Sequence, residues 1–258
     1  MDLPAFTLSA FSLEGKSAIV TGGNSGLGRA FTVALAAAGA DVLVLARTDD
    51  DGSTAQMVRA HGRGYTYLED DLTRPGAARD AIGRCVAEFG SFDIVVNSAG
   101  ICFTADPEDF DRGQWDPMLA VNLTAAFEMA KHAADHMRAH GGGKIVNVAS
   151  LFSYLGGQRS PAYAATKAGI VGFTRAYCDD LAGHNICVNA LAPGYFSTAM
   201  TLGTRSDPET NRRVIEHIPA GRWGDPADLM GAVVFLASAA SDYVNGHTLV
   251  VDGGYLVR

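Results

Sequence analysis

Near the N-terminus the sequence reads Ser17-Ala18-Ile19-Val20-Thr21-Gly22-Gly23-Asn24-Ser25-Gly26-Leu27-Gly28. The first five residues are typical of a buried strand, and a helical pattern from Arg29 to Ala38 follows the glycines. Glycine lets the backbone turn sharply beside a phosphate, whose charge is favoured by the free N–H groups at a helix start. The stretch therefore predicts a strand, a dinucleotide-binding turn and a helix. Its candidate cofactor contacts are Gly22, Asn24, Ser25, Gly26, Leu27 and Gly28.

Strand-like apolar runs alternate with helical stretches along the whole chain. Such alternation predicts a parallel sheet, and right-handed crossovers place helices on both of its faces. We therefore expect an α/β architecture over residues 1–258, a single-domain Rossmann fold with a doubly wound, seven-stranded parallel sheet. Its ligand crevice would lie at the carboxyl ends of the strands. The predicted strands are Ser17–Thr21, Asp41–Leu45, Tyr65–Leu68, Ile94–Asn97, Lys144–Val148, Ile186–Ala192 and Thr248–Val251.

A tyrosine and a lysine in the second half of the chain have a spacing that suits proton transfer. Tyr163 and Lys167 are four residues apart, and Ser150 precedes the tyrosine by thirteen residues at the end of a strand-like run. A helix would bring the tyrosine and the lysine onto one face. The ammonium would then lower the pKa of the phenol from about 10 toward neutrality, as general acid/base catalysis requires. A surface tyrosine and lysine on an ordinary amphipathic helix would have the same spacing.

Five motifs together resemble those of the short-chain dehydrogenase/reductase family. They are Thr21 to Gly28, Asn97-Ser98-Ala99-Gly100, Val121-Asn122-Leu123, the set Ser150, Tyr163 and Lys167, and Pro193-Gly194. Their order and spacing match from about Leu13 to Arg258, with Ser98 where the family usually has a second asparagine. The resemblance implies an NAD(P)-dependent oxidoreductase that transfers a hydride between a nicotinamide and a secondary alcohol or ketone.

The resemblance also implies a role for each motif. Tyr163 would be the general acid/base, Ser150 would hold the substrate oxygen, and Lys167 would lower the tyrosine pKa and bond the nicotinamide ribose. Asn122 would hold a water that extends a proton relay from the lysine. An asparagine there could also only cap or kink a long helix, predicted from about Trp115 to Arg138. The other expected cofactor contacts are Asp71, Leu72, Asn97, Ala99, Gly100, Pro193, Gly194, Phe196 and Thr198.

The choice of cofactor depends on the residues after the second strand. Dinucleotide folds that prefer NAD place an acidic residue there, whereas an arginine accommodates the 2′-phosphate of NADP. This chain has Arg47, so NADP(H) is favoured slightly over NAD(H). The three aspartates Asp49 to Asp51 would oppose a phosphate, and Ser25 adds no positive charge to the glycine turn. Asp71-Leu72 resembles the family's adenine-contacting pair, and Asp71 could instead serve only as a helix cap.

Four further stretches bear on the substrate, because they are similar to those of the family's subgroup for keto-deoxy sugar acids. They are Ala10 to Lys16, Ile218-Pro219-Ala220-Gly221-Arg222-Trp223-Gly224, Ser241 to Gly246 and the ending from Val251 to Arg258. A carboxylate is bound well by a fork of donors, so Arg159 and Arg205 are candidate ligands, although both could be surface arginines.

Other readings of the function stay open. Phe103 and Phe152 would make the pocket more apolar, which suits a carbonyl reductase for apolar ketones or 3-oxoacyl thioesters. A third possibility, from a different class, is an inactive dinucleotide-binding sensor.

The single domain is expected to have three parts. Residues 13–196 would form the cofactor-binding and catalytic core, and the polar segment 197–219 would form a lid over the substrate. Residues 220–258 would supply a C-terminal helix, a strand and a subunit contact. The resemblance implies a homotetramer.

Bulk composition narrows the class of protein. The chain has 258 residues, of which 48% are hydrophobic, enough for one full core. Its net charge of −8 disfavours nucleic acid and anionic membranes as partners and leaves a small molecule. Met1–Ser12 lacks the features of a signal peptide, and no apolar run reaches about 18 residues, so a cytoplasmic location is expected. Cysteines without a C-x-x-C pair are expected to be reduced; they are Cys85, Cys102, Cys178 and Cys187.

Three histidines could form a competing site. His132, His136 and His140 recur every four residues and would share one helix face. Asp135 points about a quarter turn away from that face, and nothing else there completes a tetrahedral set, so no metal is expected. The stripe would face solvent or a neighbouring subunit.

Overall fold

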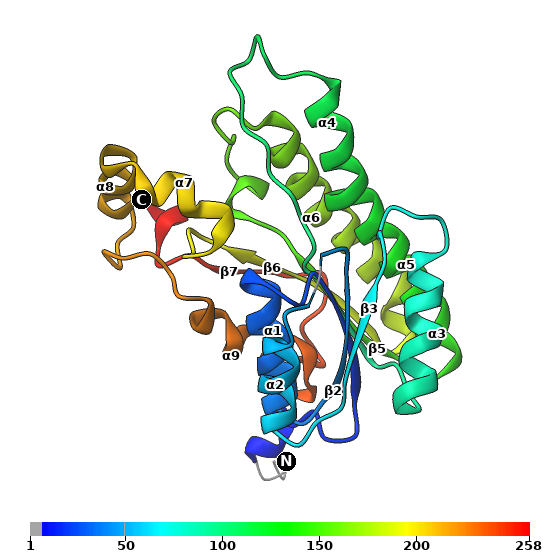
Figure 1. Cartoon of the computed structure of the whole chain (residues 1–258). Coiled ribbons are helices and arrows are strands. Elements are labelled where there is room, and N and C mark those ends of the chain that lie inside the picture. Colours follow the sequence, from blue (N-terminus) through cyan, green and yellow to red (C-terminus); the bar gives the residue numbers. More distant parts are fainter. Residues whose placement is uncertain (1–6, 49) are drawn as a thin grey trace.

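The computed structural model describes residues 7–48 and 50–258, so Asp49 and the start of Met1–Ser12 lie outside the described residues. Within these ranges seven parallel strands form one sheet in the order β3-β2-β1-β4-β5-β6-β7 (Figure 1). The predicted doubly wound sheet is confirmed, and each strand end lies within one residue of its predicted position. The strands are β1 Ser17–Thr21, β2 Asp41–Ala46, β3 Tyr65–Glu69, β4 Ile94–Asn97, β5 Gly143–Val148, β6 Ile186–Pro193 and β7 Thr248–Val251.

The strand order reverses at β1. This strand pairs with β2 on one side and with β4 on the other, so that Ile19 faces Leu43 and Val95 in register. In doubly wound sheets ligands bind outside the carboxyl ends of the strands at such a reversal. The glycine turn follows β1 and the Asn97–Gly100 motif follows β4, so both predicted motifs lie at this point.

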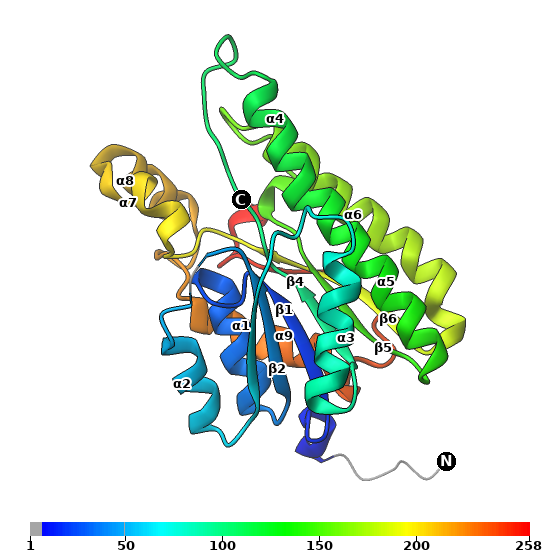
Figure 2. The ribbon, with the colours of Figure 1, turned by 45° about the vertical axis from the view of Figure 1, so that its right-hand side comes forward.

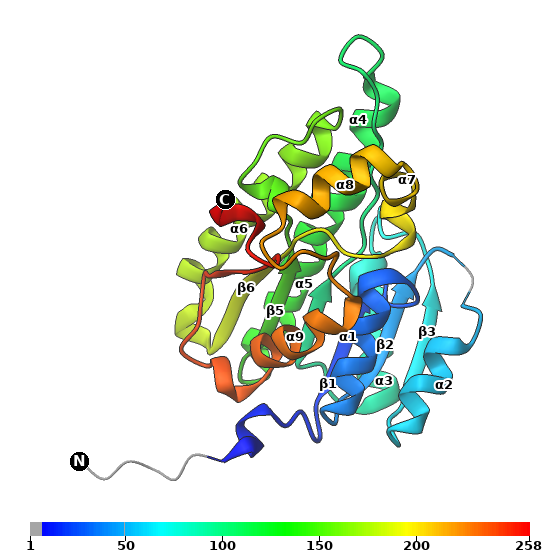
Figure 3. The same ribbon diagram turned by 90° about the vertical axis from the view of Figure 1, so that its left-hand side faces the viewer.

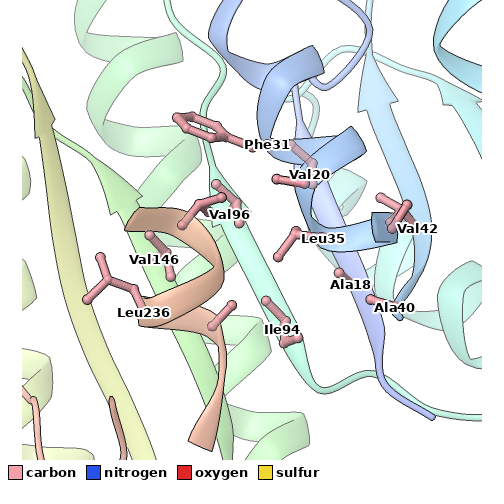
Figure 4. Close-up of a cluster of buried hydrophobic side chains, with 14 of the residues drawn as sticks. Ala18, Val20, Phe31, Leu35, Ala40, Val42, Ile94, Val96, Val146 and Leu236 are labelled. Atoms are coloured by element: carbon pink, nitrogen blue, oxygen red, sulfur yellow. The ribbon is translucent and has the colours of Figure 1, made fainter. Parts of the chain in front are cut away.

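Helices cover both faces of the sheet (Figure 2). One face carries α1 Gly26–Ala37, α2 Ser53–Ala60 and α9 Met230–Ala237, and the other carries α3 Ala77–Phe89, α5 Ala125–Ala139 and α6 Pro161–Leu181. Alternate strand residues point to opposite faces, so Val20 packs against α1 and α9 while Ile19 packs against α3 and α5. Figure 4 shows the first of these clusters, with Phe31 and Leu35 of α1 against strand valines. Because both faces are buried, the strands are continuous apolar runs.

The predicted helix from Trp115 to Arg138 is interrupted by a wider turn. It consists of α4 (Arg112–Met118), a π-helical segment (Leu119–Thr124) and α5. Asn122 lies in the π-helical segment. π-helical segments are rare in proteins, and those that do occur are frequently found at functional sites.

The segment expected to form a lid is largely helical. After β6 come a 3-10 turn (Ala199–Thr201), α7 (Leu202–Ser206) and α8 (Pro208–His217). Figure 3 shows α7 and α8 apart from the layer of α1, α2 and α9. The remaining short 3-10 helices are Leu8–Phe11, Leu151–Ser153, Ala182–His184, Pro226–Leu229, Ala239–Ser241 and Tyr255–Val257.

Candidate active site

The ends of β1 and β4 are held side by side. The Thr21 hydroxyl oxygen accepts hydrogen bonds from the backbone N–H groups of Ser98 and Ala99, both at 3.0 Å. Gly22 has a φ of +66°, and a Cβ on it would lie 3.1 Å from Ala99 Cα, so this approach requires glycine. A Cβ on Gly100 would lie 4.0 Å from the ammonium nitrogen of Lys167. The predicted cofactor residues after both strands therefore meet next to Lys167.

The glycine turn leaves the start of α1 open. A Cβ on Gly28 would lie 2.1 Å from the Gly22 carbonyl oxygen, so a larger residue would force the backbone apart. Ser25, the N-cap of α1, makes no side-chain cap hydrogen bond. The Ser25 side chain therefore does not bond the first N–H groups of α1, which form the positive end of the helix dipole. These features fit the pyrophosphate of a dinucleotide, while Leu27 packs against the core.

Asn24 ties the glycine turn to the loop after β2. Its buried Nδ2 donates to the Thr48 carbonyl at 2.9 Å and to Thr48 Oγ1 at 3.2 Å. The backbone carbonyl of Asn24 accepts hydrogen bonds from Arg29 Nε at 3.0 Å and Nη2 at 2.6 Å. Sequence reasoning misses Arg29, which donates to a backbone carbonyl, and Thr48, which accepts from the Asn24 side chain. Only the position of Arg29 next to Gly28 hints at a role.

Arg47 and Asp71 border the same edge of the site. Arg47 is 73% exposed, and its guanidinium lies 3.9 Å from a carboxylate oxygen of Asp71. The other oxygen accepts from the backbone N–H of Thr73 at 2.8 Å and from its hydroxyl at 2.7 Å. These bonds and the charge of Arg47 hold the pKa of Asp71 below its usual range. Asp71 therefore caps the turn at Thr73 and does not cap a helix, since the N-cap of α3 is Gly76. Leu72 packs against the core.

Tyr163 and Lys167 lie on one face of α6, next to Ser150 at the end of β5. Lys167 Nζ is 5.6 Å from the centre of the Tyr163 ring and donates to the Val148 carbonyl at 2.6 Å. Ser150 and Tyr163 are hydrogen bonded through their side chains. Because Lys167 is only 4% exposed, the alternative of an ordinary surface pair is wrong.

The predicted lowering of the Tyr163 pKa is contradicted. Burial raises the pKa of Tyr163 to about 12, the neighbouring Cys102 thiol adds to the rise, and the hydrogen bond with Ser150 opposes it. Burial likewise lowers the pKa of Lys167 to about 8. Removal from water disfavours the charged form of each group, and it is the largest cause of both shifts. The i, i+4 spacing reveals the neighbour and cannot reveal the burial.

Asn122 is 1% exposed and uses its amide within the protein. Its Oδ1 accepts from the Ile101 N–H, and its Nδ2 donates to the Ile101 carbonyl, both at 2.8 Å. The same Nδ2 lies 3.5 Å from Thr166 Oγ1 in α6. The side chain therefore fixes the segment after β4 against α6.

Two predicted cofactor residues direct their side chains into the interior. Asn97 Nδ2 donates to Asn147 Oδ1 at 2.8 Å and to the Ala126 carbonyl at 3.3 Å. Phe196 is 4% exposed and belongs to the core under α1 and α9. Either residue could therefore contact a cofactor through its backbone alone.

Thr198 brings the start of the segment 197–219 close to the glycine turn. A Cβ on Gly26 would lie 3.9 Å from Thr198 Cβ, and Pro193-Gly194 precedes this residue at the end of β6. Arg205 in α7 donates from Nη2 to the Thr198 carbonyl at 2.9 Å. The predicted substrate ligand Arg205 therefore also anchors the start of the segment 197–219.

Arg159 is held against the segment after β4. Its Nε lies 2.9 Å from a carboxylate oxygen of Asp106, and its carbonyl accepts from the Ala105 N–H at 2.9 Å. Its φ of +59° is uncommon for a residue with a side chain. Both predicted substrate arginines thus already have partners in the protein.

Phe152 and Cys102 lie close to the tyrosine, and Phe103 follows Cys102 in the chain. Phe152 meets the Tyr163 ring edge-on at 5.9 Å, and Phe103 is 41% exposed. Cys102 lies 3.6 Å from Ser160 Oγ and influences the pKa of both Tyr163 and Lys167. No motif marks Cys102, and its approach to the site follows from the path of the chain after β4.

The histidine stripe lies on α5, away from these groups. The rings of His136 and His140 stack at 3.9 Å, and His140 Nδ1 lies 2.8 Å from the His136 carbonyl oxygen. His132 lies 3.6 Å from a carboxylate oxygen of Glu128. Across residues 7–48 and 50–258, no group of three His, Cys, Asp or Glu side chains is placed to hold a metal ion. In the same ranges no helix has the length and apolar character to cross a membrane.

Comparison with known proteins agrees with this geometry. A family model described as enoyl-(acyl carrier protein) reductase matches residues 22–256. The 2-dehydro-3-deoxy-D-gluconate 5-dehydrogenase of Escherichia coli K12 is 47% identical, over 97% of this chain and 99% of its own. The chain belongs to the short-chain dehydrogenase/reductase family. The resemblance of the five motifs is thereby confirmed.

Two other members of the family resemble the chain along nearly its whole length. The uncharacterized oxidoreductase YgcW of Escherichia coli K12 is 58% identical, over 99% of this chain and 98% of its own. The structure of a gluconate 5-dehydrogenase from Burkholderia cenocepacia, in complex with NADP and tartrate, has a TM-score of 0.92 at 38% identity. That comparison covers 97% of this chain and 99% of the other. The likeness to members of the family therefore extends over nearly the whole chain.

Proposed function

We propose that the protein is an NAD(P)-dependent oxidoreductase that transfers a hydride between a nicotinamide and a secondary alcohol or ketone of a sugar acid. The observation that carries the proposal is the meeting of Ser150, Tyr163 and Lys167 beside the glycine turn. An inactive dinucleotide-binding sensor would not need these three groups together. The experiment is turnover of NADPH or NADH by the purified protein with keto sugar acids and neutral ketones. Absence of turnover with the whole panel would contradict the proposal.

The three side chains would divide the proton chemistry among them. A bound nicotinamide would supply or accept the hydride. Ser150 would hydrogen bond the carbonyl oxygen, and Tyr163 would give that oxygen its proton, since a phenol with a pKa of about 12 is protonated at neutral pH. Lys167, with a pKa of about 8, is mainly charged at pH 7 and would stabilise the phenolate that is left. Alcohol oxidation would run the same steps in reverse.

A sugar acid is the proposed substrate because relatives named for gluconate and 2-dehydro-3-deoxy-D-gluconate match the chain end to end. Arg159 and Arg205 are the proposed ligands of its carboxylate. The half-exposed Phe103 and the ring of Phe152 favour the second candidate, a carbonyl reductase for apolar ketones or 3-oxoacyl thioesters. The requirement for a carboxylate separates the two.

Arg205→Ala should raise KM for a keto sugar acid about tenfold and leave KM for a neutral ketone unchanged, because one charge-assisted hydrogen bond is lost. Arg159→Ala, measured in parallel, identifies which arginine carries the contact. Arg205→Lys retains the positive charge but not the fork of donors, so its KM for the keto sugar acid should lie between those of wild type and Arg205→Ala. Equal rises in KM for acid and neutral substrates would assign Arg205 to lid anchoring through Thr198 alone.

We propose that NADP(H) is preferred over NAD(H). Arg47 is exposed at the edge where a 2′-phosphate would lie, and its neighbour Asp71 is 3.9 Å away. The gluconate 5-dehydrogenase named above was solved with NADP. The remaining cofactor would be held by the glycine turn, Asp71-Leu72, Asn97, Ala99-Gly100, Pro193-Gly194, Phe196 and Thr198.

Arg47→Ala should weaken NADPH binding about tenfold or more and leave NADH binding unchanged, the loss expected for one charge-assisted bond to phosphate. The measurement is the Kd of each cofactor by fluorescence titration. Arg84→Ala, at an exposed arginine of α3 paired with Glu88, is the matched control. Equal weakening of both cofactors would contradict the preference.

The proposed assembly is a cytoplasmic homotetramer acting on a small-molecule substrate. Residues 13–196 would form its cofactor-binding and catalytic core, 197–219 would close over the substrate, and 220–258 would contribute a subunit contact. Light scattering of the purified protein tests the tetramer, and a monomeric mass would contradict it.

A further inference from the structure

The C-terminal end of the chain lies against the lid. Figures 1 and 3 both place this end beside α8. The Ala220 N–H donates to the Gly253 carbonyl at 3.0 Å, and Arg258 Nη1 donates to the Glu216 carbonyl at 2.9 Å. The ring of Tyr255 lies 4.2 Å from that of His217, the last residue of α8. The tail therefore contacts both the last turn of the lid and the segment that follows it.

A series of aromatic contacts continues from this tail to the catalytic tyrosine. The ring of Tyr255 lies 5.1 Å from that of Tyr195, which follows β6 directly. Tyr195 meets Phe152 edge-on at 6.5 Å, and Phe152 meets Tyr163 edge-on at 5.9 Å. Edge-to-face aromatic pairs have a preferred geometry, so each ring restricts the orientation of the next.

Tyr195 is held by more than one neighbour. Its hydroxyl is hydrogen bonded to that of Tyr255, and its ring meets Trp223 edge-on at 5.4 Å. Trp223 Nε1 in turn donates to Asn211 Oδ1 of α8 at 2.7 Å. A cavity of about 170 Å³ is lined in part by Tyr195 and Gly253. Two routes thus connect Tyr195 to the lid.

We propose that Tyr255 is a positioning residue for the carbonyl substrate, which acts through Tyr195 and Phe152 to hold the lid and the wall beside Tyr163 in register. The proposal rests on the proposed function for its kinetic consequence. The C-terminal part would then have two roles: the subunit contact proposed above and the positioning of residues within its own chain. Tyr255 itself touches neither the reacting groups nor the glycine turn in any contact described above.

The test compares Tyr255→Ala with Val257→Ala, a control at an 87% exposed residue of the same 3-10 helix. For Tyr255→Ala we expect KM for the carbonyl substrate to rise about tenfold, with kcat and the Kd of NADPH within about twofold of wild type. Hydrogen exchange in α8 should accelerate, and the mass of the assembly should be unchanged. Tyr195→Phe, which loses only the hydroxyl bond, should shift KM in the same direction by less.

Two results would overturn the proposal. One is that Tyr255→Ala changes neither KM nor hydrogen exchange in α8. The other is that the assembly dissociates to a smaller mass and that this dissociation accounts for the change in KM. If Tyr255→Ala does not fold, Arg258→Ala removes the bond to Glu216 from the surface, and unchanged exchange in the last turn of α8 would then count against the link. If wild type turns over no substrate, the proposed function fails, while exchange in α8 still tests the link.

Discussion

Tyr163→Phe is expected to lower kcat/KM for ketone reduction by about 10²- to 10⁴-fold, the range associated with loss of a positioned general acid. The ring and its edge contact with Phe152 remain, so the pocket should keep its shape. What is removed is the hydroxyl that Ser150 bonds and that would protonate the substrate oxygen. The measurement is steady-state turnover of NADPH at several ketone concentrations.

The controls for this variant separate chemistry from folding. The Kd of NADPH should stay within about twofold of wild type, because the glycine turn and Lys167 are unchanged. Tyr243→Phe, at a fully exposed tyrosine, should behave as wild type. Turnover by Tyr163→Phe equal to that of wild type would remove the tyrosine from its proposed role.

Lys167→Met should abolish most activity and at the same time make the protein more stable at pH 7. Activity should fall by about 10²-fold or more, because no charge remains to stabilise the tyrosine phenolate. Stability should rise because the ammonium is 4% exposed and no ion pair to it occurs within residues 7–48 and 50–258. Its only hydrogen bond described above goes to the Val148 carbonyl.

The size of the stability gain follows from the pKa. A tenfold change in proton affinity is worth ~1.4 kcal/mol, so the lowering of the Lys167 pKa from 10.5 to about 8 marks a cost of roughly 3 kcal/mol for the charged form. Methionine leaves the Val148 carbonyl without this donor, which costs about 1–3 kcal/mol. A net gain of about 1 kcal/mol would raise Tm by roughly 2–4 °C in a protein of this size.

The pH dependence provides the decisive check. Between pH 8 and 10.5 the unfolded wild-type chain binds more protons at Lys167 than the folded one, so this residue makes wild-type stability rise with pH. The stability difference between Lys167→Met and wild type should therefore narrow over that window. Urea unfolding of both proteins at pH 7 and pH 9.5 measures it, and the comparison cancels other groups that titrate there. A constant difference would show that Lys167 carries no such cost.

The strands could be predicted from the sequence because both faces of a parallel sheet are buried, so each strand is an unbroken apolar run next to glycine or a polar turn. The glycine turn and the Tyr163/Lys167 pair were equally accessible, since local spacing alone defines them. The π-helical segment around Asn122 was not, because one extra residue in a turn leaves the apolar pattern nearly unchanged.

The features that escaped the sequence depend on residues far apart in the chain. The pKa of Tyr163 is set by burial, which the i, i+4 spacing does not report. Arg159 and Arg205 each find a partner whose identity follows only from the folded path of the chain. The contact of Tyr255 with Tyr195 joins positions that no local motif connects.

The reversal of strand order at β1 separates the residues proposed for cofactor specificity from those proposed for substrate specificity. The residues proposed to distinguish NADP from NAD follow β2 and β3, whereas those proposed to contact the substrate follow β4, β5 and β6 or belong to the tail, next to the remaining cofactor contacts after β4 and β6. The contact of Thr198 with Gly26 is a place where the two halves touch. Substitutions that change cofactor specificity and substitutions that change substrate range should therefore have nearly additive effects. Non-additive effects should be concentrated around Thr198 and Gly26.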